Sequence, residues 1–158
     1  MTRVAVSGHR GLPDATERLV YQALREALAQ HSPELVGLSC IADGADQLFA
    51  QAIIDLGGQL EVVVPATKYR EALPPECWRT YDLLFSKASQ VHKLDYTEST
   101  SEAHQAASEY MVDNADVLVA VWDGLPARAY GGTADVVSYA RSSSKPVEVI
   151  WPSGATRD

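Results

Sequence analysis

Residue types that can do chemistry gather in three short segments of the sequence, each of which follows an apolar run. The segments are Ser7–Gly11 (Ser-Gly-His-Arg-Gly), Ala42–Asp46 (Ala-Asp-Gly-Ala-Asp) and Gly131–Asp135 (Gly-Gly-Thr-Ala-Asp). In each segment glycine lets the backbone approach a ligand closely, and the neighbouring polar side chains can form hydrogen bonds with it. This mixture of residues is typical of loops that bind a small polar molecule.

The segment Gly131-Gly132-Thr133 opens a predicted helix, where the first backbone N–H groups have no partner inside the helix. Those groups, together with the Thr133 hydroxyl, would hold a phosphate without any net positive charge. Arg10 would add a bidentate contact to a phosphate or a carboxylate. The alternative is a tight loop that caps the helix and binds nothing.

The other polar side chains of these loops each have two interpretations. Asp43 is favoured as the cap of the helix that follows it, and its second role is to contact a ligand or transfer a proton. Asp46 lies one turn further along, where its carboxylate either interacts favourably with the helix dipole or faces the ligand. Ser7 and His9 are turn formers or ligand contacts. No Gly-x-Ser-x-Gly segment surrounds Ser7, so a serine nucleophile is not predicted.

Gly8, Gly44 and Trp122 complete the predicted ligand-binding residues. The two glycines lie inside the first two loops, where a ligand would approach the backbone. Trp122 ends an apolar run and would stack on a base, the alternative being a core aromatic residue.

The segment from residue 95 to 126 contains no Lys or Arg and accumulates acidic residues. Within it His104 is close in sequence to Glu102 and Glu109, but a solvated acidic face is far commoner than a metal site. We therefore predict no metal and no cofactor. A face that captures a basic partner protein, between Asp95 and Asp116, remains an alternative function.

The apolar runs that precede the loops alternate with amphipathic helical stripes along the whole chain. Strands are predicted at 4–6, 35–40, 60–64, 90–93, 117–122 and 147–151, and helices at about 14–30, 45–56, 78–88, 99–111 and 133–142. This alternation predicts an α/β fold, a three-layer sandwich with a mainly parallel Rossmann-like sheet, with residues 1–158 as a single domain. Ligands of such sheets bind beyond the carboxyl ends of the strands, where the three loops are expected.

Composition limits the partners. The chain has 158 residues, 46% of them hydrophobic, and a formal net charge of −8. Such a charge disfavours generic binding to nucleic acid or to an anionic membrane. The apolar run Val117–Trp122 is far shorter than the roughly 20 residues of a membrane span. Cys40 and Cys77 have no metal-ligand spacing, which indicates free thiols and a cytoplasmic protein.

With these loops located, the chain resembles the SLOG superfamily of Rossmann-like domains, named after the Smf/DNA-processing protein A and Lonely Guy families. The resemblance runs along most of the chain and rests on residues 6–10, 42–46, 62–65 (Val-Val-Val-Pro) and 131–135, in that order. It implies a cavity for nucleotides or nucleotide-derived small molecules, with the late glycine loop on the phosphate. It also implies a homodimer, and some similar proteins act as ligand sensors.

The Lonely Guy branch of this superfamily implies an enzyme, a phosphoribohydrolase that cleaves the N-glycosidic bond of a nucleoside monophosphate. Its signature reads Pro-Gly-Gly-x-Gly-Thr-x-x-Glu, whereas Tyr130–Asp135 lacks the proline, one glycine and the glutamate. Asp135 is the nearest substitute for the catalytic carboxylate, and Asp43 is the second candidate. Either would have to stabilise an oxocarbenium-like transition state.

The leading hypothesis is therefore a binding domain for a nucleotide-type small molecule. In it Gly131, Gly132 and Thr133 hold the phosphate, the segment Ser7–Arg10 forms the neighbouring wall, and Asp43 or Asp135 meets the ribose hydroxyls. The rival hypotheses are the N-glycosidase and the protein-interaction module.

Overall fold

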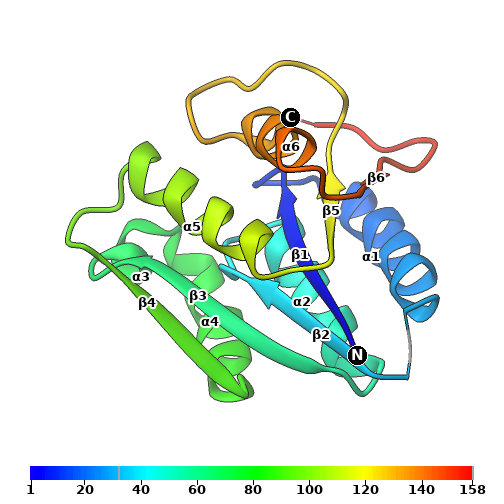
Figure 1. The fold of residues 1–158 in the computed structure, drawn as a ribbon, viewed down its shortest axis with the longest axis horizontal. Coiled ribbons are helices and arrows are strands. Elements are labelled where there is room, and N and C mark those ends of the chain that lie inside the picture. Colours follow the sequence, from blue (N-terminus) through cyan, green and yellow to red (C-terminus); the bar gives the residue numbers. More distant parts are fainter. Residues whose placement is uncertain (32, 158) are drawn as a thin grey trace.

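The computed structural model describes residues 1–31 and 33–157 and contains a six-stranded sheet in which every pair of neighbouring strands is parallel. The strand order is β4-β3-β2-β1-β5-β6, and Figure 1 shows the twisted sheet running through the molecule. The strands are β1 (Thr2–Gly8), β2 (Leu35–Ser39), β3 (Gln59–Ala66), β4 (Gln90–Tyr96), β5 (Val117–Val121) and β6 (Val147–Ile150). The predicted parallel sheet is confirmed.

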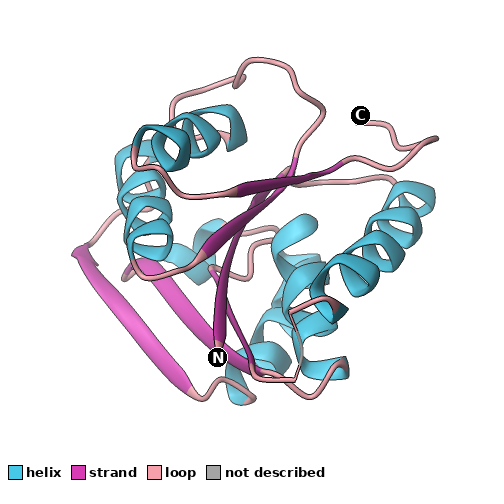
Figure 2. Cartoon of the chain, turned by 45° about the vertical axis from the view of Figure 1, so that its right-hand side comes forward, coloured by secondary structure: helices cyan, strands magenta, loops and turns pink. Residues whose placement is uncertain are grey.

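Helices cover both faces of the sheet and make the predicted three layers (Figure 2). On one face α2 packs against both α1 and α4, and on the other α5 packs against α6. The helices are α1 (Asp14–Ala29), α2 (Ala45–Asp55), α3 (Tyr69–Ala72), α4 (Trp78–Ser86), α5 (Ser101–Asp113) and α6 (Thr133–Ser142). Among the described residues, none of these helices has the length and hydropathy needed to cross a bilayer.

The apolar runs fix which strands lie inside the sheet. Every residue of β2 and of β5 is buried, as parallel strands with helices on both faces require. β5 lies between β1 and β6 and is therefore an internal strand. The edge strand β4 is largely exposed, because it has a neighbour on one side only. Each fully buried Val or Leu contributes roughly 1.5–3 kcal/mol, so the inner strands dominate the core.

Element ends are where the sequence-based predictions err. α1 begins after Pro13 with no side-chain cap, although Asp14 and Glu17 have the spacing of a capping box. α5 begins at Ser101, two residues after the predicted start at 99, and is capped by Thr100, whose hydroxyl accepts from the Ala103 N–H at 3.1 Å. Between the predicted strand 60–64 and the predicted helix 78–88 lies the additional short helix α3, and β3 continues through Pro65 to Ala66.

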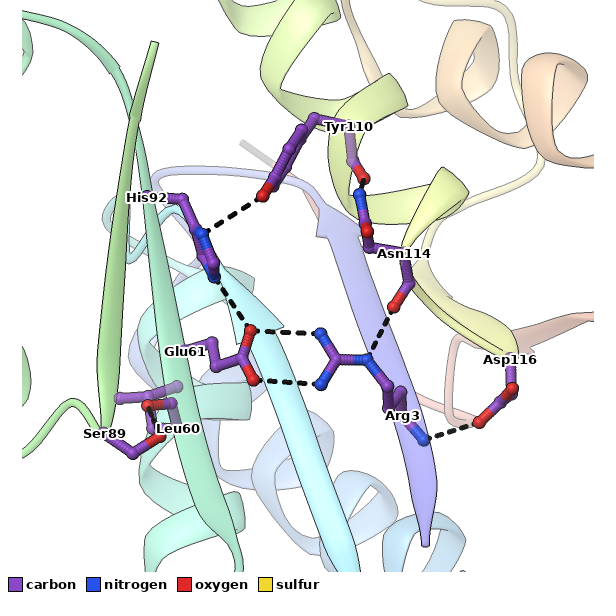
Figure 3. Close-up of polar contacts among 8 residues, drawn as sticks. All are labelled: Arg3, Leu60, Glu61, Ser89, His92, Tyr110, Asn114 and Asp116. Atoms are coloured by element: carbon purple, nitrogen blue, oxygen red, sulfur yellow. Dashed lines mark hydrogen bonds and ion pairs between the residues drawn. The ribbon is translucent and has the colours of Figure 1, made fainter.

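A polar network joins α5 to the sheet near the amino ends of the strands (Figure 3). The Glu61 carboxylate accepts two hydrogen bonds from the Arg3 guanidinium at 2.9 and 3.0 Å and lies 2.9 Å from His92 Nε2. His92 Nδ1 is 3.1 Å from the Tyr110 hydroxyl on α5. The bonds from Arg3, and then those from His92, lower the pKa of Glu61 although its side chain is buried.

Candidate functional site

A cavity of about 230 Å³, here called the first cavity, opens at the carboxyl end of β1. It brings together residues from all three predicted loops. The predicted residues that line it are Ser7, Gly8, His9, Arg10, Asp46, Gly131, Gly132 and Thr133. The predicted residues outside its lining are Asp43, Gly44, Trp122 and Asp135.

Strand order explains why these loops meet. β1 lies between β2 and β5: the chain first adds β2, β3 and β4 on one side of β1 and then adds β5 and β6 on the other side. Such a switch in crossover direction leaves a crevice beyond the strand ends. α2 and α6 lie on opposite faces of the sheet (Figure 1), and the cavity is lined by Asp46 from the first turn of α2 and by Thr133, the first residue of α6. The cavity therefore lies where a Rossmann-like sheet is expected to bind its ligand.

Two glycines let the first and second loops approach each other. A Cβ atom on Gly8 would clash with the Cβ of Ala45, the first residue of α2, and would lie 2.8 Å from the Val121 Cβ on β5. Gly44 has a φ of +84°, and a Cβ atom there would lie 2.6 Å from the His9 carbonyl oxygen. The same carbonyl accepts a hydrogen bond from the Ala45 N–H at 3.1 Å. Gly44 thus acts through loop packing and begins α2 as its N-cap.

His9 is a neutral wall of the first cavity. The Asp123 backbone N–H donates to His9 Nε2 at 3.0 Å, which places the imidazole proton on Nδ1. Burial and the nearby charge of Arg157 lower the pKa of His9, which favours the neutral imidazole. The His9 ring also meets the Trp151 ring edge to face, with centroids 5.5 Å apart. Only 6% of His9 is exposed, so its position is fixed before any ligand arrives.

Arg10 and Asp43 form an ion pair beside the cavity. The Arg10 Nε donates to Asp43 Oδ1 at 2.8 Å, and the Gly11 N–H donates to Asp43 Oδ2 at 3.1 Å. The favoured prediction that Asp43 caps α2 is therefore wrong, since its carboxylate turns to the first loop and a charge-assisted bond outcompetes a helix cap. Arg10 itself lines the cavity with a half-exposed side chain.

The amino end of α6 offers fewer amides than the sequence indicates. The Gly131 N–H donates to Asp135 Oδ2 at 3.0 Å, and the Gly132 N–H donates to the Ala129 carbonyl at 3.2 Å. Gly131 has a φ of +87°, which turns its N–H back toward the helix. Within the described part of the chain, the N–H groups of Thr133 and Ala134 have no hydrogen-bond partner. These two amides, and not those of the glycines, can receive an anion.

Asp46 is the carboxyl group that lines the first cavity. Its Oδ2 receives one long hydrogen bond, 3.4 Å from the Ala42 N–H. Burial raises the pKa of Asp46 to about 7, and the charge of Arg10 only partly opposes this shift. Asp46 therefore changes its charge in the physiological pH range and has spare acceptor capacity.

Sequence reasoning missed the wall that α5 and α3 provide. His104, Ser108 and Met111 line the cavity from α5. His104 Nε2 lies 2.8 Å from the Ser99 hydroxyl, and its ring meets the Tyr69 ring with centroids 5.7 Å apart. Burial lowers the pKa of His104, which favours the neutral imidazole. The spacing 104, 108, 111 marks one helical face and was the available signal.

The surroundings of Trp122 fit one of the two alternatives that the sequence raised for this residue. The Trp122 indole N–H donates to the Leu125 carbonyl at 2.8 Å, and its ring packs against the hydrophobic core. This arrangement agrees with the alternative in which Trp122 is a core aromatic residue. Among residues 1–31 and 33–157, no three His, Cys, Asp or Glu side chains form a group that could hold a metal ion. Cys40 and Cys77 are both buried free thiols, and burial raises the pKa of Cys40.

The sequence matches no family model and no curated protein, but solved structures share its fold. DNA processing protein A (DprA) from Streptococcus pneumoniae superposes with a TM-score of 0.70 at 17% identity, covering 98% of this chain and 52% of that protein. DprA from Helicobacter pylori gives 0.68 at 16% identity, covering 98% and 68%. These solved structures share the Rossmann-like fold that the resemblance implies for this chain.

A second group of similar structures consists of proteins described as binding or carrying the molybdenum cofactor. The molybdenum cofactor binding protein from Rippkaea orientalis superposes with a TM-score of 0.61 at 17% identity, covering 94% of this chain and 75% of that one. The chain spans about half the length of the S. pneumoniae protein. At these identities the comparisons establish the fold, and the function has to be argued from the cavity.

Proposed function

We propose that the first cavity binds a nucleotide-type small molecule through its phosphorylated sugar. The observation that carries this proposal is the convergence of three polar loops on one cavity of about 230 Å³ at the carboxyl end of β1. Cavities for drug-sized ligands are typically about 300–1,000 Å³. The first cavity therefore suits a sugar phosphate, with the base at its mouth.

The amino end of α6 is the phosphate site in this proposal. The N–H groups of Thr133 and Ala134 and the Thr133 hydroxyl are donors with no hydrogen-bond partner among the described residues. Arg10 and Arg157, which also line the cavity, place guanidinium N–H groups near this site, although each is paired with a carboxylate, Asp43 and Asp123 respectively. Helix dipole, free amides and guanidinium groups all favour an anion at this place.

Asp46 is the sugar site in the proposal. α2 reaches the cavity from the face of the sheet opposite to α6, so a ligand with its phosphate at Thr133 extends toward Asp46. An ionised carboxylate accepts hydrogen bonds from vicinal ribose hydroxyls, as acidic residues do in other Rossmann-like sites. Asp46 thus takes the role that the sequence analysis gave to Asp43 or Asp135, since Asp43 is bonded to Arg10 of the first loop and Asp135 to Gly131 of its own loop.

A small molecule is favoured over a nucleic acid strand by charge. One of the similar structures is described by a single-stranded DNA binding mode and another by a molybdenum cofactor. This chain carries a formal net charge of −8, whereas strand binding needs clustered cations that release counterions. A short single-stranded oligonucleotide is the control ligand for this choice.

Calorimetric titration with nucleoside 5′-monophosphates tests the phosphate site. The variant Thr133→Val keeps the side-chain volume and removes one donor, so we expect about tenfold weaker binding. The matched control Thr80→Val lies on the exposed side of α4 and should bind as wild type does. Equal affinity of the two variants, or tight binding of the oligonucleotide and none of the monophosphates, contradicts the proposal.

The role of Asp46 is tested by comparing a ribonucleotide with its 2′-deoxy analogue. Because Asp46 ionises around pH 7, the preference for the ribonucleotide should rise between pH 6 and pH 8. The ratio of the two affinities cancels the titration of the phosphate itself. In Asp46→Asn the ratio should not change with pH, and a pH-dependent ratio in that variant would exclude Asp46.

Asp46 also supports hydrolysis of the N-glycosidic bond as a second candidate function. A carboxyl group with a pKa of about 7 can donate a proton to a departing base. Release of free base from a nucleoside monophosphate, lost in Asp46→Asn and retained in Asp43→Asn, is the result that this function requires. Without base release, the protein binds and does not cleave.

A further inference from the structure

A second cavity of about 370 Å³ lies between the β3–β4 edge of the sheet and α4. It shares no lining residue with the first cavity. Val64 and Ala66 line the second cavity, whereas Pro65 between them lines the first, because successive side chains of a strand point to opposite faces. The two cavities are therefore separate places in the fold.

The interior of the second cavity is apolar and partly aromatic. Val64 and Ala66 of β3 and Tyr81 and Phe85 of α4 line its interior, and the polar residues Arg70, Asp82 and Lys93 line its rim. The Tyr81 and Phe85 rings are stacked, with centroids 6.0 Å apart and planes 22° apart. Burial raises the pKa of Tyr81 to about 12, so its hydroxyl stays neutral. A ligand body that matches this lining is flat and apolar.

The rim of the second cavity holds one cation that is already paired. The Arg70 guanidinium donates two hydrogen bonds to the Asp82 carboxylate at 2.8 and 2.7 Å. It also lies 4.7 Å from the centre of the Trp78 ring, and the Trp78 indole N–H donates to the Arg70 carbonyl. Arg70 and Asp82 thus neutralise each other and form a rigid wall.

Lys93 is the second cation of this rim. It lies on β4, its side chain is exposed, and no described residue forms a hydrogen bond or ion pair with its ammonium group. By contrast, Lys68 in the neighbouring loop is paired with Glu98 at 3.0 Å. An apolar cavity with one uncompensated ammonium at its edge complements a ligand that has an apolar body and one negative charge.

We propose that the second cavity is a binding site for a flat aromatic monocarboxylate, with the ring between β3–β4 and α4 and the carboxylate on Lys93. This site is independent of the nucleotide proposal. Val64 of β3 is in register with Lys93 of β4, so both residues lie on the same face of the sheet, and the ring and the carboxylate of one ligand can reach them together.

The probe pair 2-naphthylacetate and 2-naphthylacetamide tests this site, since the two differ in charge and share one ring. We expect saturable binding of the carboxylate to the whole protein, and binding of the amide about tenfold weaker. Backbone amide signals of Leu94 and Phe85 should shift on titration, while those of Ser7 and Thr133 should not. Equal affinity for both probes, no saturation into the millimolar range, or shifts at the first cavity instead overturns the proposal.

Two variants locate the charge and the ring. Lys93→Met keeps the aliphatic stem and should bind the carboxylate and the amide with about equal affinity. Lys87→Met, at the exposed end of α4, should keep the wild-type ratio of the two affinities. Val64→Phe fills the cavity from a partly exposed position and should weaken both probes about tenfold or more. Unchanged probe binding in Lys93→Met and Val64→Phe, with folding intact by circular dichroism, excludes this cavity.

Discussion

Two carboxyl groups, Glu61 and Asp46, are both withdrawn from water, and they differ in how many hydrogen-bond partners their oxygens have. Glu61 near the amino ends of the strands accepts from Arg3 and His92 and has a lowered pKa. Asp46 at the opposite end of the sheet receives one 3.4 Å hydrogen bond and has a pKa of about 7. A carboxylate with all its partners holds a structure together, and one without them is available to a ligand.

Removing Glu61 should give the largest change in stability. Glu61→Ala leaves the Arg3 guanidinium and the His92 ring without their shared partner, so we expect a loss of about 2–4 kcal/mol in the free energy of unfolding. Urea unfolding followed by circular dichroism measures it. Glu98→Ala, which removes one member of an exposed pair, is the control and should leave the transition unchanged. A loss for Glu61→Ala no larger than the control's would show that the network is dispensable.

Asp46 should give an effect of the opposite sign. Its pKa is raised from 3.8 to about 7 on folding, so the native state binds the extra proton between these values and stability falls as pH rises from about 4 to 7. Asp46→Asn removes that loss. We expect the variant to be about 1–2 kcal/mol more stable than wild type at pH 8 and similar to it at pH 4. A variant that is less stable than wild type at pH 8 would mean that the ionised carboxylate has a partner.

Glu61 should show the reverse pH dependence. Its folded pKa is lowered, mainly by the Arg3 hydrogen bonds, so its contribution is present above the unfolded pKa and is lost as pH falls through the folded value. The difference in unfolding free energy between wild type and Glu61→Ala should therefore shrink in acid. A difference that stays constant down to pH 2 would assign the effect to packing instead of charge.

Asp135 should give the smallest effect. Its carboxylate accepts from the Gly131 N–H and orders the start of α6. Asp135→Ala should cost about 1 kcal/mol of stability, as the loss of a helix cap does, and should weaken nucleotide binding because Thr133 is then less fixed. Thermal unfolding and titration measure the two effects. An Asp135→Ala protein with unchanged stability and no affinity would make Asp135 a direct ligand contact.

The fold was predictable because its signals are local. Continuous apolar runs such as Val117–Val121 and helical stripes such as that of Ala45–Asp55 are properties of neighbouring residues, and the parallel sheet follows from their order. The same is true of the loops Ser7–Gly11 and Gly131–Asp135. Their place at one sheet edge follows from the strand order that the alternation implies.

The details of the site were less predictable because they depend on tertiary contacts. Whether the Gly131 amide is free depends on a φ of +87° and on the reach of Asp135, and neither can be read from spacing. The turn of Asp43 toward Arg10 is a competition between two partners. Tyr69 and Arg157 reach the cavity from distant segments without any motif.

A crystal structure of the protein with a bound nucleoside 5′-monophosphate tests the central claim most directly. We predict phosphate oxygens about 3 Å from the backbone nitrogens of Thr133 and Ala134, with a ribose hydroxyl within hydrogen-bond distance of Asp46. A nucleotide bound elsewhere, or a phosphate held by other groups while both amides stay without a partner, would contradict the claim.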